Sequence, residues 1–138
     1  MRQGNQQDYL SDDFGDFHRL TRTTGADDSE HAPVIRTVGD CAVVELSGEI
    51  DLLAFHRTAP LLDAVTAGPY RVVVIDLTGT TFFDCSGLSL LVRARRRARA
   101  RDGRVAVVCR HPLTLRIIEL SGLTRSLGPV ATVEEALR

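Results

Sequence analysis

The chain has 138 residues, of which 43% are hydrophobic and 25% are charged, and its formal net charge at pH 7 is −1. These values are typical of one globular domain, and a charge so close to zero gives no indication of a nucleic-acid-binding protein. All 17 basic residues are arginine, so the chain lacks the lysine that a P-loop or a Schiff base requires.

The chain contains three cysteines (Cys41, Cys85 and Cys109) and four histidines. Their number and spacing fit neither a disulfide framework nor a zinc site, so we expect a reducing environment, no metal and no cofactor. We see no apolar signal segment at the N-terminus, and the longest aliphatic runs are too short to cross a bilayer. We therefore expect a cytoplasmic protein that binds neither a membrane nor nucleic acid directly.

The first 33 residues are acidic and show no period that could bury one face. They carry seven acidic residues and three arginines, whereas the rest of the chain has 11 acidic residues and 14 arginines. We expect residues 1–33 to be a disordered tail and residues 34–138 to form the folded domain.

Two short apolar segments follow the tail and predict a β-hairpin. They are "VIRTV" and "AVVELSG", and they flank the turn pair Gly39-Asp40. The next segment, "GEIDLLAFHRTAPLLDAV", has helical spacing, and Pro60 within it indicates irregular first turns or a helix that starts near the proline. The expected buried face of this helix consists of Leu53, Leu61, Leu62 and Val65.

A continuous apolar run, "RVVVIDL", predicts a central strand that is covered on both faces. A second helix is expected to begin near Asp84 or Cys85, with Ser86, Arg93 and Arg97 along one stripe. Its expected buried face, at about 100° per residue, consists of Gly87, Leu90, Leu91, Ala94 and Ala98.

The C-terminal part of the sequence continues the alternation of strands and helices. "RVAVVC" predicts another buried strand, and "HPLTLRIIELSGL" predicts a helix with Pro112 in its first turn and Gly122 at its end. Thr132 and Glu135 have the spacing of a capping box for a last short helix. The order ββαβαβα, followed by a further strand or directly by the last helix, predicts an α/β fold. We expect a small, mixed and mostly parallel sheet with helices packed mainly on one face.

The segment "TTFFDCSGLSLLVRARRRARA" (residues 80–100) places an acid, a thiol and a hydroxyl where a loop becomes a helix. One explanation is the nucleophile of a serine hydrolase, with His56 or His111 as its base. The nucleophile elbow Gly-x-Ser-x-Gly is absent, however, because Asp84 and Leu88 stand where the motif places its glycines around Ser86.

A second explanation is a redox thiol at Cys85, since a helix N-terminus makes a thiol more reactive. No resolving cysteine is near in the sequence, and a small residue that fits the turn would serve equally well. A third explanation is modification of the hydroxyl: phosphorylation of Ser86 adds about −1.5 to −2 charges at a helix end that tolerates them. The local pattern alone also fits simple capping of the helix by Asp84 and Ser86.

Three segments, in order, resemble the STAS domain and more narrowly the bacterial anti-sigma factor antagonists. They are "VVELSGEIDLLAF", "RVVVIDLTGTTFFDCSGLSLLVRARRRARARDGRVAVV" and "RIIELSGLTRSLGPVATVEEAL", and the likeness covers residues 34–138. Its most specific part is Asp-x-Ser-Gly-Leu after a buried strand. The resemblance implies a single STAS-like domain: a small sheet with helices packed mainly on one side.

The resemblance also implies that Ser86 is the phosphorylation site and that Asp51 contacts the partner. The implied partners are an anti-sigma factor with ATP-dependent serine kinase activity and a metal-dependent serine phosphatase. Unphosphorylated antagonist binds the anti-sigma factor and frees the sigma factor, whereas phosphorylated antagonist releases the anti-sigma factor. Two features depart from the family pattern: Cys85 stands where many members have a second serine, and the acidic tail has no counterpart.

We therefore expect a phosphoprotein that regulates transcription by partner switching, and not an enzyme. The expected docking surface consists of Asp51, Asp84, Cys85, Gly87, Leu88, Arg93 and Arg97. The two arginines are expected to contact acidic groups of the partner. Two alternatives stay open: a STAS scaffold or sensor subunit of a larger signalling or transport assembly, and, more remotely, a serine hydrolase.

Overall fold

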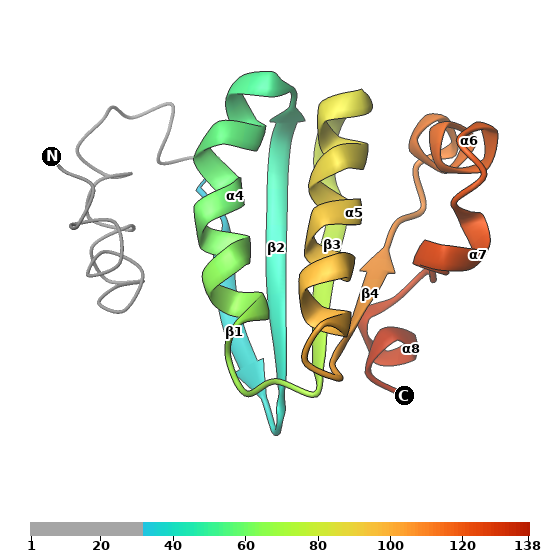
Figure 1. The fold of residues 1–138 in the computed structure, drawn as a ribbon. Coiled ribbons are helices and arrows are strands. Elements are labelled where there is room, and N and C mark those ends of the chain that lie inside the picture. The colour runs from blue at the N-terminus through green and yellow to red at the C-terminus, as the bar shows by residue number, and fades with distance from the viewer. Residues whose placement is uncertain (1–31) are drawn as a thin grey trace, which may run out of the picture. The chain divides into compact units, whose positions relative to one another are not determined.

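A computed structural model describes residues 32–138, so the predicted disordered tail lies, up to residue 31, outside the described residues. Four strands form one sheet in the order β1 (Val34–Val38), β2 (Cys41–Ile50), β3 (Val72–Phe83) and β4 (Arg104–Val108) (Figure 1). β1 runs antiparallel to β2, and the other two pairs are parallel. The predicted α/β fold with a mixed, mostly parallel sheet is confirmed.

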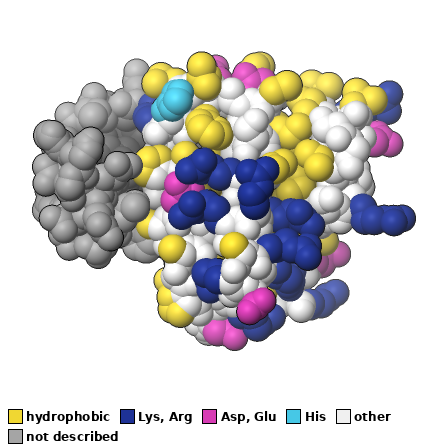
Figure 2. All heavy atoms as spheres, viewed as in Figure 1, with side chains coloured by type: hydrophobic (Ala, Val, Ile, Leu, Met, Phe, Trp, Pro, Cys, Tyr) yellow, Lys and Arg dark blue, Asp and Glu magenta, His cyan; other side chains and the backbone are white. Residues whose placement is uncertain are grey.

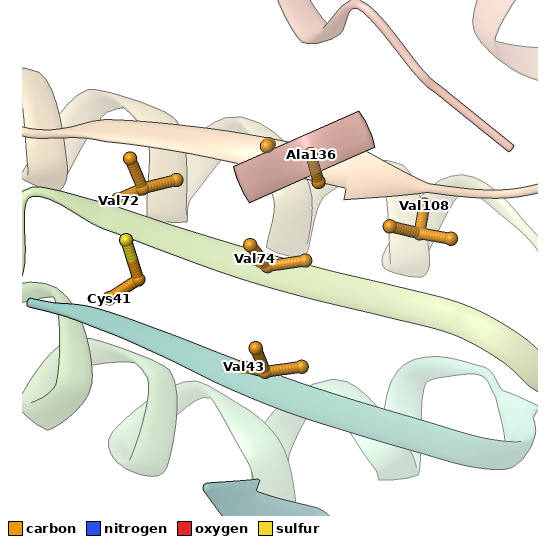
Figure 3. Close-up of a cluster of buried hydrophobic side chains, with 7 residues drawn as sticks. Cys41, Val43, Val72, Val74, Val108 and Ala136 are labelled. Carbon is orange, nitrogen blue, oxygen red and sulfur yellow. The ribbon is translucent and has the colours of Figure 1, made fainter. Parts of the chain in front are cut away.

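Five helices accompany the sheet in the described part of the chain. They are α4 (Leu52–Thr66), α5 (Cys85–Arg99), α6 (Pro112–Leu120), α7 (Thr124–Leu127) and α8 (Val133–Leu137). The two long helices, α4 and α5, lie side by side on one face of the sheet (Figure 1). The short α8 packs on the other face, against β3 and β4 (Figure 3). The expectation that the helices mainly favour one face thus holds for the long helices.

The face of the sheet under α8 is apolar because alternate residues of each strand point to it. Its buried side chains form the cluster drawn in Figure 3: Cys41, Val43, Val72, Val74, Ala106, Val108 and Ala136. α8 is held in place by the predicted capping box, in which Thr132 and Glu135 each bond the backbone of the other. The C-terminal segment therefore covers the β3 and β4 part of the face that the long helices leave open.

The first helix begins earlier than the proline suggested. α4 starts at Leu52 because Asp51 caps it, and Pro60 lies inside the helix, where it removes one backbone hydrogen bond. Leu61, Leu62 and Val65 are buried as predicted. The prediction for Leu53 is wrong: this side chain is 62% exposed, since a start at Leu52 turns the second helical position away from the sheet.

The remaining predicted elements are confirmed, with one addition. The hairpin turn has Gly39 at φ +60°, α5 buries the five predicted residues, and Gly122 ends α6 at φ +74°. A four-residue helix, α7, was not predicted, and it buries Leu127. The further strand that the sequence left open is a single bridge between Val108 and Val130.

Candidate functional site

Two strand-to-helix junctions lie next to each other at one edge of the sheet. β2 and β3 are parallel neighbours, and their last residues, Ile50 and Phe83, are paired in the register. An aspartate follows each of them, Asp51 before α4 and Asp84 before α5. Because parallel strands end at the same edge, the first turns of α4 and α5 lie side by side (Figure 1).

The junction before α5 holds the sequence-predicted phosphorylation site. The Asp84 carboxylate accepts a hydrogen bond of 2.8 Å from the Ser86 backbone N–H, and the Asp84 carbonyl accepts one of 3.1 Å from Leu88. Cys85 is exposed, while Ser86 and Leu88 are partly buried. Among the described residues, the Ser86 hydroxyl has no hydrogen-bond partner. The site therefore presents a hydroxyl on a turn that Asp84 fixes.

Gly87 is required by the way this turn sits on the strand before it. A Cβ atom at Gly87 would lie 2.6 Å from the ring of Phe83, and that ring is only 6% exposed. Real Cβ atoms essentially never approach so closely, so a side chain at this position would displace either the ring or the helix. The glycine thus contributes to the shape of the site and has no side chain to offer a partner.

The junction before α4 has the same construction with different side chains. The Asp51 carboxylate accepts a hydrogen bond of 3.0 Å from the Ala54 N–H, and the Asp51 carbonyl accepts one of 2.9 Å from Phe55. Leu52 and Leu53, in the first turn, are 61% and 62% exposed. Asp51 therefore has a structural role as a cap at the junction next to the Ser86 turn, and its contact with a partner stays a prediction.

The two predicted arginines of α5 are engaged within the domain. Arg93 contacts the Asp63 carboxylate with two nitrogens, at 2.9 and 2.8 Å, and Arg97 Nε lies 3.1 Å from the same carboxylate. The hydrogen bond with Asp63 raises the pKa of Arg93. Asp63 belongs to α4, so the trio joins the two long helices. Sequence spacing revealed the arginine stripe, but it gave no signal for Asp63 as the shared acid.

The described residues do not form the catalytic arrangement of a serine hydrolase around Ser86. The His111 ring bonds the carbonyl of Thr78 at 3.1 Å, and the His56 ring packs edge-on against Phe55. Within residues 32–138, neither imidazole bonds the Ser86 hydroxyl. A base hydrogen-bonded to its nucleophile, as a serine hydrolase has, is thus not formed in the described structure.

The described cysteines form no disulfide, and the described acidic side chains form no metal-binding group. Cys41 and Cys109 are buried, and burial raises the pKa of Cys109. All three cysteines are free. No group of three or more His, Cys, Asp or Glu side chains between residues 32 and 138 is arranged to hold a metal ion. The helices of this region are also too short or too polar to span a membrane.

One exposed apolar residue beside the site escaped the sequence analysis. Phe82 is 51% exposed, whereas the next residue, Phe83, is buried under α5. The alternation of a strand could have separated them, because consecutive strand residues face opposite sides of the sheet. The sequence alone did not say which of the two faces the helix.

Comparison with known proteins assigns the chain to a family. The STAS domain matches residues 32–136. A Mycobacterium tuberculosis protein, Rv2638, named as a candidate anti-anti-sigma factor, is 30% identical over 93% of this chain and 81% of its own length. The chain therefore belongs to the STAS domain family, in the group of anti-sigma factor antagonists.

Solved structures agree in fold. The crystal structure of an anti-sigma factor antagonist from Mycobacterium paratuberculosis aligns with a TM-score of 0.71 and 30% identity, over 77% of this chain and 90% of that one. The anti-sigma factor antagonist SpoIIAA, in its unphosphorylated form, aligns with a TM-score of 0.67 and 25% identity, over 77% and 93% of the two chains. The fold, with its two adjacent junctions, is thus similar to that of proteins named as antagonists.

Proposed function

We propose that the chain is an anti-sigma factor antagonist whose binding to its partner is switched by phosphorylation of Ser86. The observation that carries the proposal is the turn itself: a partly exposed hydroxyl without a hydrogen-bond partner in the described chain, at the N-terminus of a helix. The relatives support this role, because they are named as antagonists and the SpoIIAA structure is named for its unphosphorylated form.

The turn is suited to carry a phosphate without unfolding. Phosphorylation adds about −1.5 to −2 charges at neutral pH, and the free N–H groups of a helix N-terminus stabilise an anion. Asp84 already occupies the N–H of Ser86, so the phosphate would stand beside a second negative group. Phosphorylation thereby changes the charge and bulk of the surface and leaves the packing beneath it intact.

In this scheme the chain is a substrate and a binding partner, and catalysis belongs to other proteins. The Ser86 oxygen attacks the γ-phosphorus of ATP held with Mg²⁺ by the anti-sigma factor, whose base takes the hydroxyl proton, and ADP leaves. A metal-dependent phosphatase hydrolyses the phosphoserine to serine and inorganic phosphate. We further propose that residues 34–138 carry this activity and that the protein acts in the bacterial cytoplasm.

The proposed docking surface surrounds the Ser86 turn. Asp51, Asp84, Cys85, Gly87 and Leu88 all belong to the two neighbouring junctions. Arg93 and Arg97 lie further along α5. Arg93 is committed to Asp63, whereas Arg97 pairs with Asp63 through Nε. The terminal nitrogens of Arg97 are the better candidates to meet an acidic group of the partner.

The switch needs only a modest difference in binding free energy. A change of about 3–4 kcal/mol weakens binding several hundred-fold, and an added charge at the centre of an interface can supply this amount. Such a difference can release a partner without any rearrangement of the fold.

Phosphorylation of Ser86 is tested with the anti-sigma factor kinase and ATP. We expect one phosphate per chain, located on Ser86 by mass spectrometry, and none on Ser86→Ala. Ser89→Ala is the matched control, because Ser89 is an exposed serine of the same helix three residues later. Equal phosphorylation of Ser86→Ala and the wild-type chain would show that the site is elsewhere.

Partner switching is tested by a pull-down from the host with unmodified protein and with Ser86→Asp. We expect an anti-sigma factor of the ATP-binding kinase type with the unmodified chain and its selective loss with Ser86→Asp. Identical sets of captured proteins would contradict a switch at this position.

A further inference from the structure

We propose that Leu52 and Leu53 form an apolar anchor for the anti-sigma factor beside Ser86. The inference rests on the proposed function and deepens it. It assigns an energetic role to the junction before α4, and it specifies that the partner surface facing this junction is apolar.

The two leucines contribute little to the fold they belong to. They are 61% and 62% exposed, although the buried face of α4 begins with the next residue, Ala54. A first helical turn favours acidic side chains, and α4 has none there. Single exposed apolar residues are ordinary, but adjacent ones at a binding surface are typical of contacts with a partner. Folding alone therefore does not account for two neighbouring leucines at this position.

The anchor is continuous with the proposed docking surface. Ile50 pairs with Phe83 in the sheet, so the residues that follow them start from strands about 5 Å apart. Leu53 is the second residue of α4, and Ser86 is the second residue of α5. Packed helices lie about 8–10 Å apart, so a partner that covers Ser86 also reaches Leu53. Figure 2 shows hydrophobic side chains, interspersed with acidic ones and a histidine, along the edge where these two helices begin.

The leucines are the apolar part of a mixed surface. The exposed side chains at this edge include the two leucines, Phe82 and the Cys85 thiol, which behaves as a small apolar group, together with the acidic Glu49. The carboxylates of Asp51 and Asp84 are both engaged with backbone N–H groups. A partner that covers Ser86 therefore meets apolar side chains at the two leucines and acidic groups at the two aspartates.

The charged surface of α5 lies elsewhere. Arg93 and Arg97 are about two and three turns further along the helix and are paired with Asp63. In Figure 2 most of the basic side chains gather below the upper edge of the molecule. An interface that covers Ser86 and the leucines therefore has a basic margin along α5.

The anchor is tested by measuring Kd for the anti-sigma factor with Leu52→Ser and Leu53→Ser. We expect binding to weaken by about 10- to 100-fold, as for interface residues that lose a buried aliphatic side chain. Val38→Ser is the control, because Val38 is also exposed but lies at the far end of the sheet, about 30 Å away along β2. Thermal unfolding of each variant checks that the fold is retained.

The possible results separate the anchor from the function on which it rests. If the unmodified chain captures no anti-sigma factor, the proposed function and the anchor both fail. A second result would overturn the anchor alone. In it, the unmodified chain binds the anti-sigma factor and its phosphorylated form does not, but Leu52→Ser and Leu53→Ser both bind with a Kd within twofold of wild type. A change in self-association by sedimentation, with unchanged partner affinity, would assign the leucines to a second copy of the chain and also overturn the anchor.

Discussion

α4 and α5 begin beside each other at one edge of the sheet, with the same backbone arrangement and different exposed side chains. In each case an apolar strand end is followed by an aspartate whose carboxylate accepts a backbone N–H of the first turn. The third helical position is buried in both, as Ala54 in α4 and Gly87 in α5. The first two positions are the variable ones: two leucines in α4, and Cys85 and Ser86 in α5.

The comparison separates residues that build a junction from residues that it presents. The aspartate and the third position determine the geometry, because one caps the helix and the other packs on the strand. The first two positions are needed neither for capping nor for packing on the strand, so they can carry binding or modification chemistry. One backbone design thus places a modifiable hydroxyl and an apolar surface side by side.

The largest effect on stability is expected at the buried third position of the helices, where α5 has Gly87 and α4 has Ala54. Gly87→Ala places a methyl group within 2.6 Å of the Phe83 ring, so we expect the free energy of unfolding to fall by about 1–3 kcal/mol in urea denaturation. The double variant with Phe83→Leu should lose less than the sum of the two single variants, because the smaller side chain makes room. A Gly87→Ala chain as stable as wild type would show that the close approach is not required.

Removal of the aspartate caps is expected to have the next largest effect on the free energy of unfolding. The effect should be similar at both junctions. Asp51→Ala and Asp84→Ala should each lower the free energy of unfolding by about 1 kcal/mol, because each leaves a backbone N–H without its acceptor. Asp51→Asn and Asp84→Asn are the controls, since asparagine also caps helices well. If alanine were harmless at one junction only, the two would not be structurally equivalent.

The sequence predicts the junction before α5 better than the one before α4, for a physical reason. Asp84 follows the apolar strand end Phe82-Phe83 and precedes a helical pattern without proline, so the start of α5 is evident from the pattern. In α4 the proline at position 60 competes with the cap at Asp51 as a start signal. The cap decides, because a proline inside a helix costs one hydrogen bond whereas packing against the sheet stabilises the whole helix. Leu53, which the helical spacing places in the core, lies about 100° around α4 from Ala54, the first buried residue, and is exposed.

Other features depend on contacts that are distant in sequence. Asp63 lies 30 residues before Arg93, and only the packing of α4 on α5 makes it the acid for both arginines. The four-residue α7 has too few residues for a period, and it forms because Leu127 packs into the core. Local patterns do not contain such information, whereas they sufficed to place Ser86 on its exposed turn.

A smaller effect is expected at the contact that keeps α4 and α5 together behind the junctions. Asp63 is 15% exposed and pairs with two arginines, so Asp63→Ala should lower the free energy of unfolding by up to about 1 kcal/mol. Glu119→Ala is the matched control, because its pair with Arg116 is 65% exposed on both sides and should contribute almost nothing. Equal effects of the two substitutions would show that the shared acid does not stabilise the helix pair.

The smallest effect on stability is expected at the first helical position, where Leu52 corresponds to Cys85. Cys85→Ser should change the free energy of unfolding by less than about 0.5 kcal/mol, because the side chain is exposed and makes no hydrogen bond within the described chain.

Iodoacetamide should alkylate Cys85 in the folded protein while Cys41 and Cys109, which are buried, react only after unfolding. Peptide mapping before and after denaturation distinguishes the three thiols. Alkylation of Cys109 at the rate of Cys85 in the native protein would mean that the sheet opens where the structure shows it closed. Selective alkylation of Cys85 would show that the first position of a junction is open to solvent and to a partner, as the comparison of α4 with α5 requires.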